Sequence, residues 1–309
     1  MSLLDRAIVR ALPVVPRPVV QMISARYIAG RRLEDACRVV AGLNESGKLA
    51  TIDVLGEEIT TPGEAERIRD AYLAVLAAIE RERLDANISV KLTALGLKLD
   101  YGLCRANLEA VVADAAERSN FVRIDMEDAT CTEDTIRLYR ELRVARHENV
   151  GVVLQAYLRR TLDDIRALAD LRPNVRLCKG IYVEPPEIAF QDDDEIRESF
   201  VRALEALLDL GAYVGIATHD ERLLGQAERL VAEHGLGRGE YEFQMLLGVR
   251  EPRAADLVRG GHCLRVYVPF GEQWYEYSLR RLQENPKIAG YIAADTVGRV
   301  LSLGRNGRR

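Results

Sequence analysis

The feature of this sequence that most constrains its fold is a regular alternation of short strand-like runs and longer helical stretches. Eight runs are rich in β-branched and apolar residues and cover 50–57, 87–96, 121–128, 149–158, 174–183, 213–220, 241–248 and 262–271. The run 150–154 is almost wholly apolar, which is typical of a parallel strand covered on both faces. Every interval between the runs is long enough for a crossover helix.

The intervals themselves have the spacing of amphipathic helices. Apolar side chains recur every three or four positions at Ala65, Ile68, Tyr72, Val75 and Ile79, and again at Ile196, Phe200, Ala203, Leu204, Leu207 and Leu208, where Gly211 ends the pattern. Eight strand–helix units without a glycine-rich dinucleotide fingerprint favour an α/β fold of the (β/α)8 TIM-barrel type over a doubly wound sheet. We expect the barrel at 50–285, an N-terminal helical arm at 1–49, and a C-terminal helix with a basic tail at 286–309.

Composition excludes several other classes. The chain has 43 Lys and Arg against 48 Asp and Glu, with no basic stripe, which argues against a nucleic-acid partner. Its five cysteines are isolated and it contains neither a C-x-x-C nor an H-E-x-x-H motif, so we expect a reducing cytoplasm and no metal. No apolar run reaches the ~18–20 residues that cross a bilayer. Asp5, Arg6 and Arg10 interrupt any signal peptide.

The predicted strands end in polar residues, and in a barrel of this kind the chemistry lies at the carboxyl ends of the strands. These residues are Glu57, Lys91, Asp125, Gln155, Arg176, Lys179, Tyr182, Thr218, His219, Asp220, Gln244 and Tyr267. Each has a structural alternative: Lys91 or Asp125 as half of a buried ion pair, His219 as a helix cap. Together they predict a pocket for a large polar ligand, because a buried charge must be paired or used.

A helical segment follows the last strand and carries two adjacent arginines. At helical spacing Tyr277, Arg280, Arg281 and Glu284 share one face. Paired guanidiniums beside an aromatic ring suit a small anion such as a carboxylate held bidentately. The alternative is a solvated helix face with an Arg280–Glu284 pair.

Ordered motifs in this chain resemble the proline dehydrogenase family in its short, monofunctional bacterial form, which is related to the proline dehydrogenase domain of the bifunctional proline utilisation enzymes. The matching segments are 53–57 (DVLGE), 88–92 (ISVKL), 124–127 (IDME), 154–157 (LQAY), 176–180 (RLCKG), 217–219 (ATH), 243–246 (FQML) and 277–284. They occur in the order found in the family and cover the chain from about residue 26 to 285.

The resemblance implies oxidation of L-proline to 1-pyrroline-5-carboxylate, with hydride passing to FAD and electrons passing on to a membrane quinone. By the same resemblance, Arg280, Arg281 and Lys91 hold the substrate carboxylate, and Tyr182, Leu246, Tyr267 and Tyr277 enclose the ring. Asp125 and Arg176 lie at the reacting edge of the flavin, and Glu57 gates the site by pairing with Arg280. FAD is held by Met126, Gln155, Lys179, Gly180, Ile181, Thr218, His219 and Glu284.

Further expectations concern partners and departures from the family. The resemblance implies a cytoplasmic enzyme with peripheral contact to the inner face of the membrane, and a separate pyrroline-5-carboxylate dehydrogenase. Where the family often has basic residues after Tyr182, this chain has 191–194 (QDDD), which we predict to be a helix N-cap, and Cys178 stands where valine is more common. Two other functions stay open: a cofactor-free lyase or aldolase with a Schiff base on Lys91, and a non-enzymatic ligand sensor.

Overall fold

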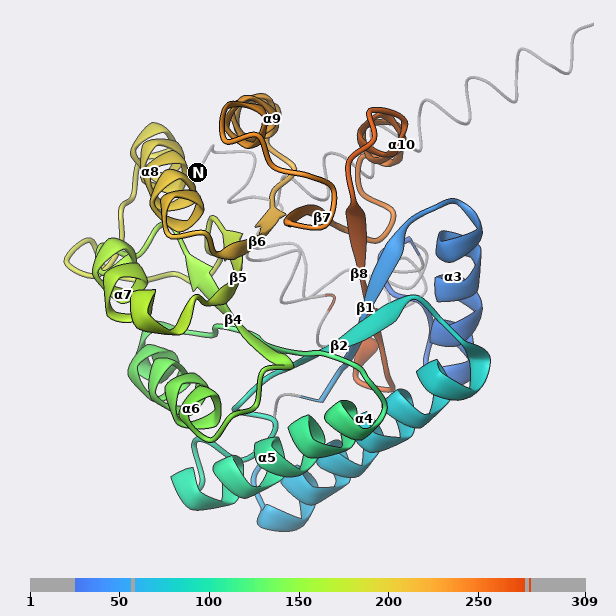
Figure 1. Ribbon diagram of the computed structural model, residues 1–309. Helices are drawn as coiled ribbons and strands as arrows, with labels where there is room; N and C mark the ends of the chain where they lie inside the picture. Colours follow the sequence, from blue (N-terminus) through green and yellow to red (C-terminus); the bar gives the residue numbers. More distant parts are fainter. Residues whose placement is uncertain (1–25, 57–58, 276–277, 279–309) are drawn as a thin grey trace, which may run out of the picture.

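Eight parallel strands form a closed barrel in which each strand pairs with its neighbours in chain order (Figure 1). The computed structural model describes residues 26–56, 59–275 and 278. The strands are β1 Leu49–Val54, β2 Ala86–Val90, β3 Val122–Ile124, β4 Val150–Gln155, β5 Asn174–Cys178, β6 Tyr213–Ala217, β7 Tyr241–Leu246 and β8 Leu264–Phe270. β1 pairs with both β2 and β8, which closes the barrel and confirms the predicted (β/α)8 fold.

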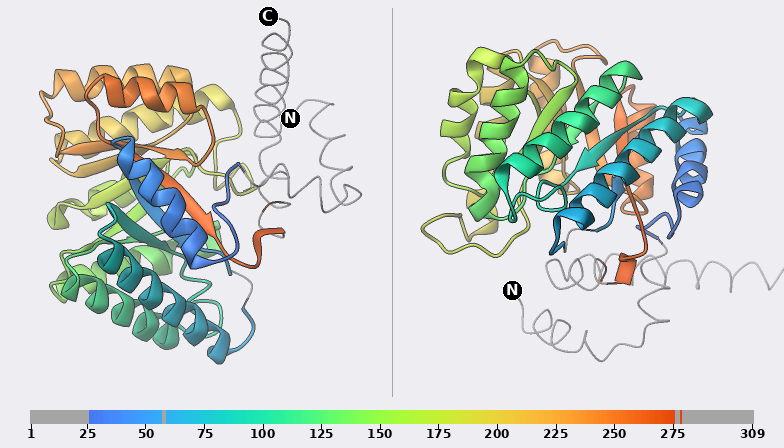
Figure 2. Two further views of the ribbon diagram at one scale, coloured as in Figure 1. Left: turned by 90° about the vertical axis from the view of Figure 1, so that its right-hand side faces the viewer. Right: turned by 90° about the horizontal axis from the view of Figure 1, so that it is seen from below.

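The helices form a ring outside the barrel (Figures 1 and 2). They are α3 Leu33–Glu45, α4 Pro62–Glu82, α5 Tyr101–Glu117, α6 Thr132–Val144, α7 Thr161–Ala167, α8 Asp193–Asp209, α9 Glu221–Glu233 and α10 Glu251–Arg259, with short 3-10 turns at Ala129–Cys131 and Ala169–Leu171. α3 precedes β1 and packs against β1 and β8. The domain boundaries stay a prediction, because 1–25 and 286–309 lie outside the described residues.

Local sequence signals account for where the longer helices begin. α4 starts with a capping box between Thr61 and Glu64 and has Pro62 in its first turn. Asp192 is the N-cap of α8, and its carboxylate accepts hydrogen bonds from the backbone N–H groups of Asp194 and Glu195, so the predicted N-cap in 191–194 is confirmed. The apolar stripes of both helices face the strands, and burying one such side chain stabilises the fold by about 1.5–3 kcal/mol.

The strands are shorter than the sequence runs, so several site residues expected within strands follow them instead. β2 ends at Val90 and β3 at Ile124, so Lys91 and Asp125 are the first residues after their strands. The backbone N–H of Leu95 bonds to the carbonyls of Lys91 and Leu92, and this turn leaves the sheet. The apolar sequence runs extend past the ends of the strands because the residues that follow a buried strand are themselves buried, as Leu92 and Leu95 are.

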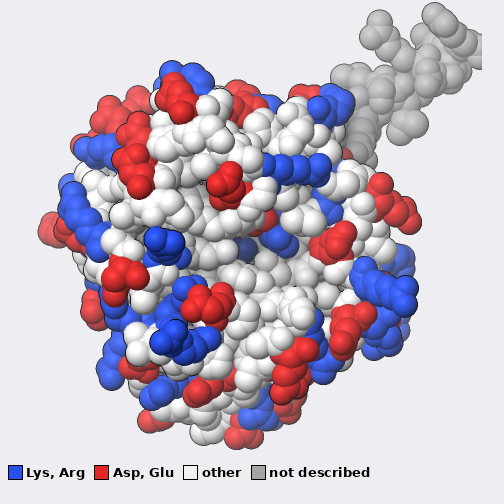
Figure 3. All heavy atoms as spheres, viewed as in Figure 1, with Lys and Arg blue, Asp and Glu red and all other residues white. Residues whose placement is uncertain are grey.

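All strands point their carboxyl ends to one side of the barrel. The segment that follows β8 lies on the far side in the view of Figure 1, as Figure 2 makes clear. Figure 3 therefore shows the opposite end, where acidic and basic side chains are intermixed around a hollowed centre and no large area has a single sign. Among the described residues, no helix combines the length and apolarity needed to cross a bilayer.

Candidate active site

Lys91 is held inside the barrel mouth by residues from the first and last strands. Its ammonium donates to Asp53 Oδ2 at 2.7 Å and to the Tyr267 hydroxyl at 3.1 Å. Asp53 is fully buried and also accepts from the Tyr72 hydroxyl at 3.1 Å. Tyr72 lies on α4, outside the barrel, and its burial followed by the nearby Asp53 charge raises its phenol pKa well above the usual value. The ammonium charge of Lys91 is thus balanced by Asp53.

A second ion pair lies beside the first. Arg176 Nη1 donates to Asp125 Oδ1 at 2.7 Å and to the Ser89 hydroxyl at 3.0 Å, while Ser89 donates to the same carboxylate oxygen at 2.6 Å. The other oxygen of Asp125 accepts from Tyr267 at 3.2 Å and lies 3.6 Å from the Lys91 ammonium. Burial alone would raise the pKa of Asp125, but the charges of Arg176 and Lys91 outweigh it and lower that pKa.

The side chain of Arg176 is also fixed by hydrogen bonds inside the barrel, through Gln244 of β7. Its Nε donates to Gln244 Oε1 at 2.5 Å, the amide nitrogen of Gln244 donates to Glu242 at 2.5 Å, and Glu242 accepts from Arg265 at 2.8 Å. Gly215 makes room for this chain of bonds, because a Cβ there would lie 2.4 Å from the Gln244 amide nitrogen. Arg176 therefore has one orientation, with its guanidinium anchored on two sides.

The hydrogen bonding of Gln155, at the end of β4, shows whether the residues present fit a flavin. Its amide nitrogen donates to the backbone carbonyls of Met126 at 2.9 Å and Glu127 at 3.0 Å, which orients the amide. Its oxygen is buried and has no hydrogen-bond partner among the residues that the structure describes. A buried acceptor without a partner costs stability unless a donor reaches it, and an imide N–H such as that of a flavin ring would serve. The residues present fit this group.

The backbone after β5 passes Tyr157 so closely that only glycine fits at position 180. Gly180 has a φ of +107°, and a Cβ on it would lie 2.0 Å from the Tyr157 ring. The Tyr157 N–H bonds to the carbonyl of Lys179 at 2.8 Å and holds the two segments together. This contact places Lys179, Gly180 and Ile181, three predicted cofactor residues, next to the end of β4.

Replacing Gly180 by alanine is expected to lower the free energy of unfolding by about 1–3 kcal/mol, because the new Cβ meets Tyr157 in a backbone conformation that alanine rarely adopts. Urea unfolding measures the effect. The control is Gly225→Ala within α9, where no atom lies within 4 Å of the added Cβ. Alanine is the better helix former, so this variant should be neutral or stabilised by up to about 1 kcal/mol. Equal stabilities for the two variants would contradict the conclusion that only glycine fits at position 180.

Thr218 and His219 organise the end of β6. The Thr218 hydroxyl accepts from the backbone N–H of Asp220 at 3.1 Å, and His219 Nε2 accepts from the backbone N–H of Leu246 at 3.0 Å. Because that N–H only donates, Nε2 carries no proton and Nδ1 does. Burial and then the Arg250 charge lower the pKa of His219 to about 4, so the ring is neutral at neutral pH. The helix-cap alternative for His219 is wrong, since the N-cap of α9 is Asp220.

The structure brings most of the predicted residues to one end of the barrel, but not all are within the described part. Glu57, Tyr277, Arg280, Arg281 and Glu284 lie outside the described residues, so their roles stay predictions. Tyr182 and Leu246 are half-buried on the segments after β5 and at the end of β7.

Sequence reasoning assigned no role to Asp53, Ser89, Tyr72 or Gln244. Asp53 has a usable signal, the one charged residue within the largely apolar run 50–55, and the structure buries it completely. Tyr72 has none, because it fits the apolar stripe of α4 as well as an alanine or leucine would. Both structural alternatives for Lys91 and Asp125 are partly right, since each residue belongs to an ion pair.

Comparison with known proteins identifies the family that this chain resembles. The family model described as proline dehydrogenase matches residues 36–293. The chain is 39% identical over 267 residues to "Proline dehydrogenase 1" of Bacillus subtilis (strain 168), which covers 86% of this chain and 88% of the relative. It is 35% identical over 294 residues to "Proline dehydrogenase" of Deinococcus radiodurans, covering 91% of this chain and 94% of the relative.

Solved structures support the fold. Proline utilization A from Bdellovibrio bacteriovorus, inactivated by N-propargylglycine, superposes with a TM-score of 0.82 at 22% identity, and proline utilization A from Corynebacterium freiburgense with 0.77 at 22%. The matches cover 90% and 93% of this chain but only 36% and 34% of those longer chains. The family match over most of the chain and the identities to curated relatives agree with the strand-end cluster. This chain belongs to the proline dehydrogenase family.

Proposed function

We propose that this protein oxidises L-proline to 1-pyrroline-5-carboxylate with FAD as its cofactor, as the first step of proline catabolism. Bound FAD supplies the acceptor for the hydride that leaves the ring carbon beside nitrogen. The observation that carries the proposal is the hydrogen-bonded cluster of Lys91, Asp125, Arg176 and Tyr267 at the mouth, together with the unpartnered oxygen of Gln155.

Within this cluster the side chains have separable tasks. Asp125 and Arg176 form a rigid pair beneath the mouth, and Tyr267 joins that pair to Lys91. Since Asp53 balances the charge of Lys91, we propose that Arg280 and Arg281 supply the net positive charge for the proline carboxylate. Cations around the substrate also disfavour its ammonium form, and hydride can leave only when the amine is neutral.

The proposal extends to electron transfer and to the next enzyme. Reduced flavin passes its electrons to a membrane quinone, so we propose peripheral contact with the inner face of the membrane. A separate pyrroline-5-carboxylate dehydrogenase would consume the product.

The lyase alternative fits the site less well. A Schiff-base lysine needs a neutral amine, whereas the Lys91 ammonium lies 2.7 Å from a fully buried carboxylate. Borohydride trapping of a carbonyl substrate on Lys91 would support that alternative. Binding of proline without turnover would support the sensor.

Purified protein is expected to carry FAD, and anaerobic L-proline is expected to bleach the flavin absorption band. The physical reason is that the strand-end residues hold both cofactor and substrate, and without oxygen the reduced flavin accumulates. The measurement is a titration followed by absorbance, with buffer alone as the control. A protein that binds no FAD even after reconstitution, or a band that L-proline leaves unchanged, would contradict the proposed function.

A further inference from the structure

One carboxylate at the start of α9 binds two cations from two other segments. Asp220 Oδ2 lies 2.5 Å from the Lys179 ammonium, which follows β5, and 2.7 Å from Arg197 Nε on α8. The side chain of Asp220 is 13% exposed, that of Arg197 23% and that of Lys179 30%, so water screens these pairs less than it screens surface pairs. Lys179 is a proposed cofactor residue, while no role has been assigned to Asp220 or Arg197.

We infer that Asp220 is a positioning residue of the cofactor site, which fixes the Lys179 ammonium and, together with Arg197, sets the positive charge near the flavin. The inference rests on the proposed function, because it requires Lys179 to lie beside FAD. Charge near a flavin ring adjusts its electronics, and a positive charge favours the anionic reduced form.

The Asp220 carboxylate is held in place independently of Lys179. Its other oxygen accepts from the backbone N–H of Arg222 at 3.1 Å and so caps α9, and its own N–H bonds to the Thr218 hydroxyl. Burial alone would raise the pKa of Asp220, but hydrogen bonds from Lys179 and Arg197 lower it to about 2. The carboxylate is therefore ionised at neutral pH and anchored to a helix end, which gives the flexible lysine a fixed partner.

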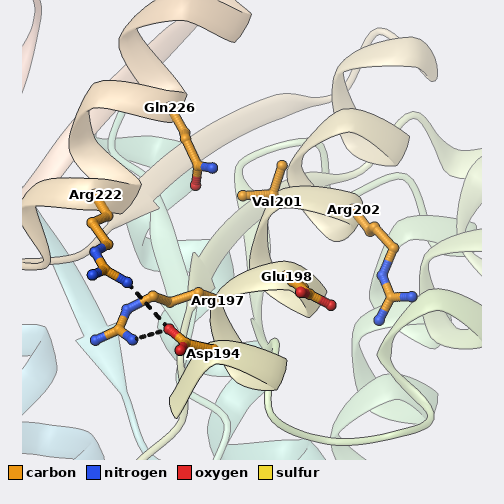
Figure 4. A pocket seen from close by; sticks show the side chains of 7 residues that line it. All are labelled: Asp194, Arg197, Glu198, Val201, Arg202, Arg222 and Gln226. Atoms are coloured by element: carbon orange, nitrogen blue, oxygen red, sulfur yellow. Dashed lines mark hydrogen bonds and ion pairs between the residues drawn. The ribbon is translucent and has the colours of Figure 1, made fainter.

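Arg197 is anchored from the opposite side. Its Nη1 lies 2.6 Å from Asp194, which Arg222 also approaches at 3.3 Å. Figure 4 shows Arg197 of α8 and Arg222 of α9 converging on Asp194 in a groove between the two helices, while Arg202, also on α8, points away from them. Arg197 offsets part of the negative charge that Asp220 brings to Lys179, so the two residues act on Lys179 with opposite sign.

Because the two residues carry opposite charges, replacing each of them should shift the flavin midpoint potential in opposite directions. With charges of +1 for Lys179, +1 for Arg197 and −1 for Asp220, the three groups sum to +1; Asp220→Asn makes the sum +2, and Arg197→Met makes it 0. We expect Asp220→Asn to favour the reduced flavin about tenfold, a rise of about 30 mV in the two-electron midpoint potential. Arg197→Met is expected to lower the potential, and the double variant to return it toward wild type. Spectroelectrochemistry of the FAD-loaded proteins measures all three.

Matched variants separate this role from a structural one. Asparagine caps a helix as well as aspartate, so Asp220→Asn should lower the melting temperature only through the two lost ion pairs. Asp220→Glu should restore the potential by restoring the charge. Arg202→Met, in the same groove, should leave the potential unchanged. A structural role alone would not give shifts of opposite sign.

Acetylation of Lys179, followed by mass spectrometry, reports the ion pair directly and should be faster in Asp220→Asn. Wild-type protein that binds no FAD would overturn the proposed function and this inference together. FAD-loaded wild type that L-proline bleaches, combined with unchanged potentials in Asp220→Asn and Arg197→Met, would overturn this inference alone.

Discussion

Replacing Asp53 by alanine is expected to lower the free energy of unfolding by about 3–5 kcal/mol, the usual cost of removing one partner of a buried ion pair. Asp53 is fully buried and accepts hydrogen bonds from Lys91 and Tyr72. Without it, the Lys91 ammonium, in a site only 6% exposed, loses the carboxylate that balances its charge. Urea unfolding at neutral pH measures the loss.

Two further variants decide whether the effect arises from the buried pair. Asp53→Asn combined with Lys91→Met removes both charges, so it should recover much of the lost stability while proline turnover stays low. Asp163→Ala removes an exposed acid that lies 2.6 Å from Arg166, with both side chains more than 70% exposed, and should cost at most about 1 kcal/mol. A cost for Asp53→Ala no greater than that for Asp163→Ala would show that the pair is not important for stability.

Replacing Arg176 by methionine is expected to lower kcat/KM for proline by roughly 30-fold to several-thousand-fold, which corresponds to a loss of ~2–5 kcal/mol when a desolvated charge loses its partner. Arg176 is the residue that fixes Asp125 at the mouth, and Gln244 holds its orientation from below. Steady-state kinetics with L-proline gives the loss, and the flavin absorbance of the purified variant gives the FAD content.

The same variant should change the stability of the protein with pH. Asp125 has a lowered pKa in the folded protein, so it contributes stability that is present above its unfolded pKa of about 3.8 and is lost as the pH falls through the folded value. Without Arg176 the pKa of Asp125 rises, and this contribution shrinks at neutral pH. The gap in unfolding free energy between wild type and Arg176→Met should therefore narrow as the pH falls below about 4.

Arg176→Lys is the conservative control. It keeps the charge but cannot bond Asp125, Ser89 and Gln244 with one planar group, so we expect partial recovery of stability and little recovery of turnover. An Arg176→Met enzyme with kcat/KM within about threefold of wild type would contradict the role at the reacting centre.

The barrel and most of its site follow from local patterns in the sequence. Apolar periodicity identified all eight strands and their crossover helices, and the rule that parallel strands end on one side placed Lys91, Asp125 and Arg176 together. The polar run 191–194 marked the N-cap of α8 because capping depends on neighbours within three residues. Strand ends were placed too late at Lys91 and Asp125, since burial continues past the last ladder hydrogen bond.

What the sequence could not show is which charges meet. Asp53 and Lys91 are 38 positions apart, Arg176 and Gln244 are 68, and Lys91 and Tyr267 are 176. Side chains of this length reach across the barrel, so strand register and the space left by Gly215 select one partner among several. Tyr72 meets Asp53 only because α4 packs over β1 and β2. Local periodicity therefore determined the fold and the end of the barrel that carries the chemistry, whereas the ion pairs depend on long-range packing that only the tertiary structure decides.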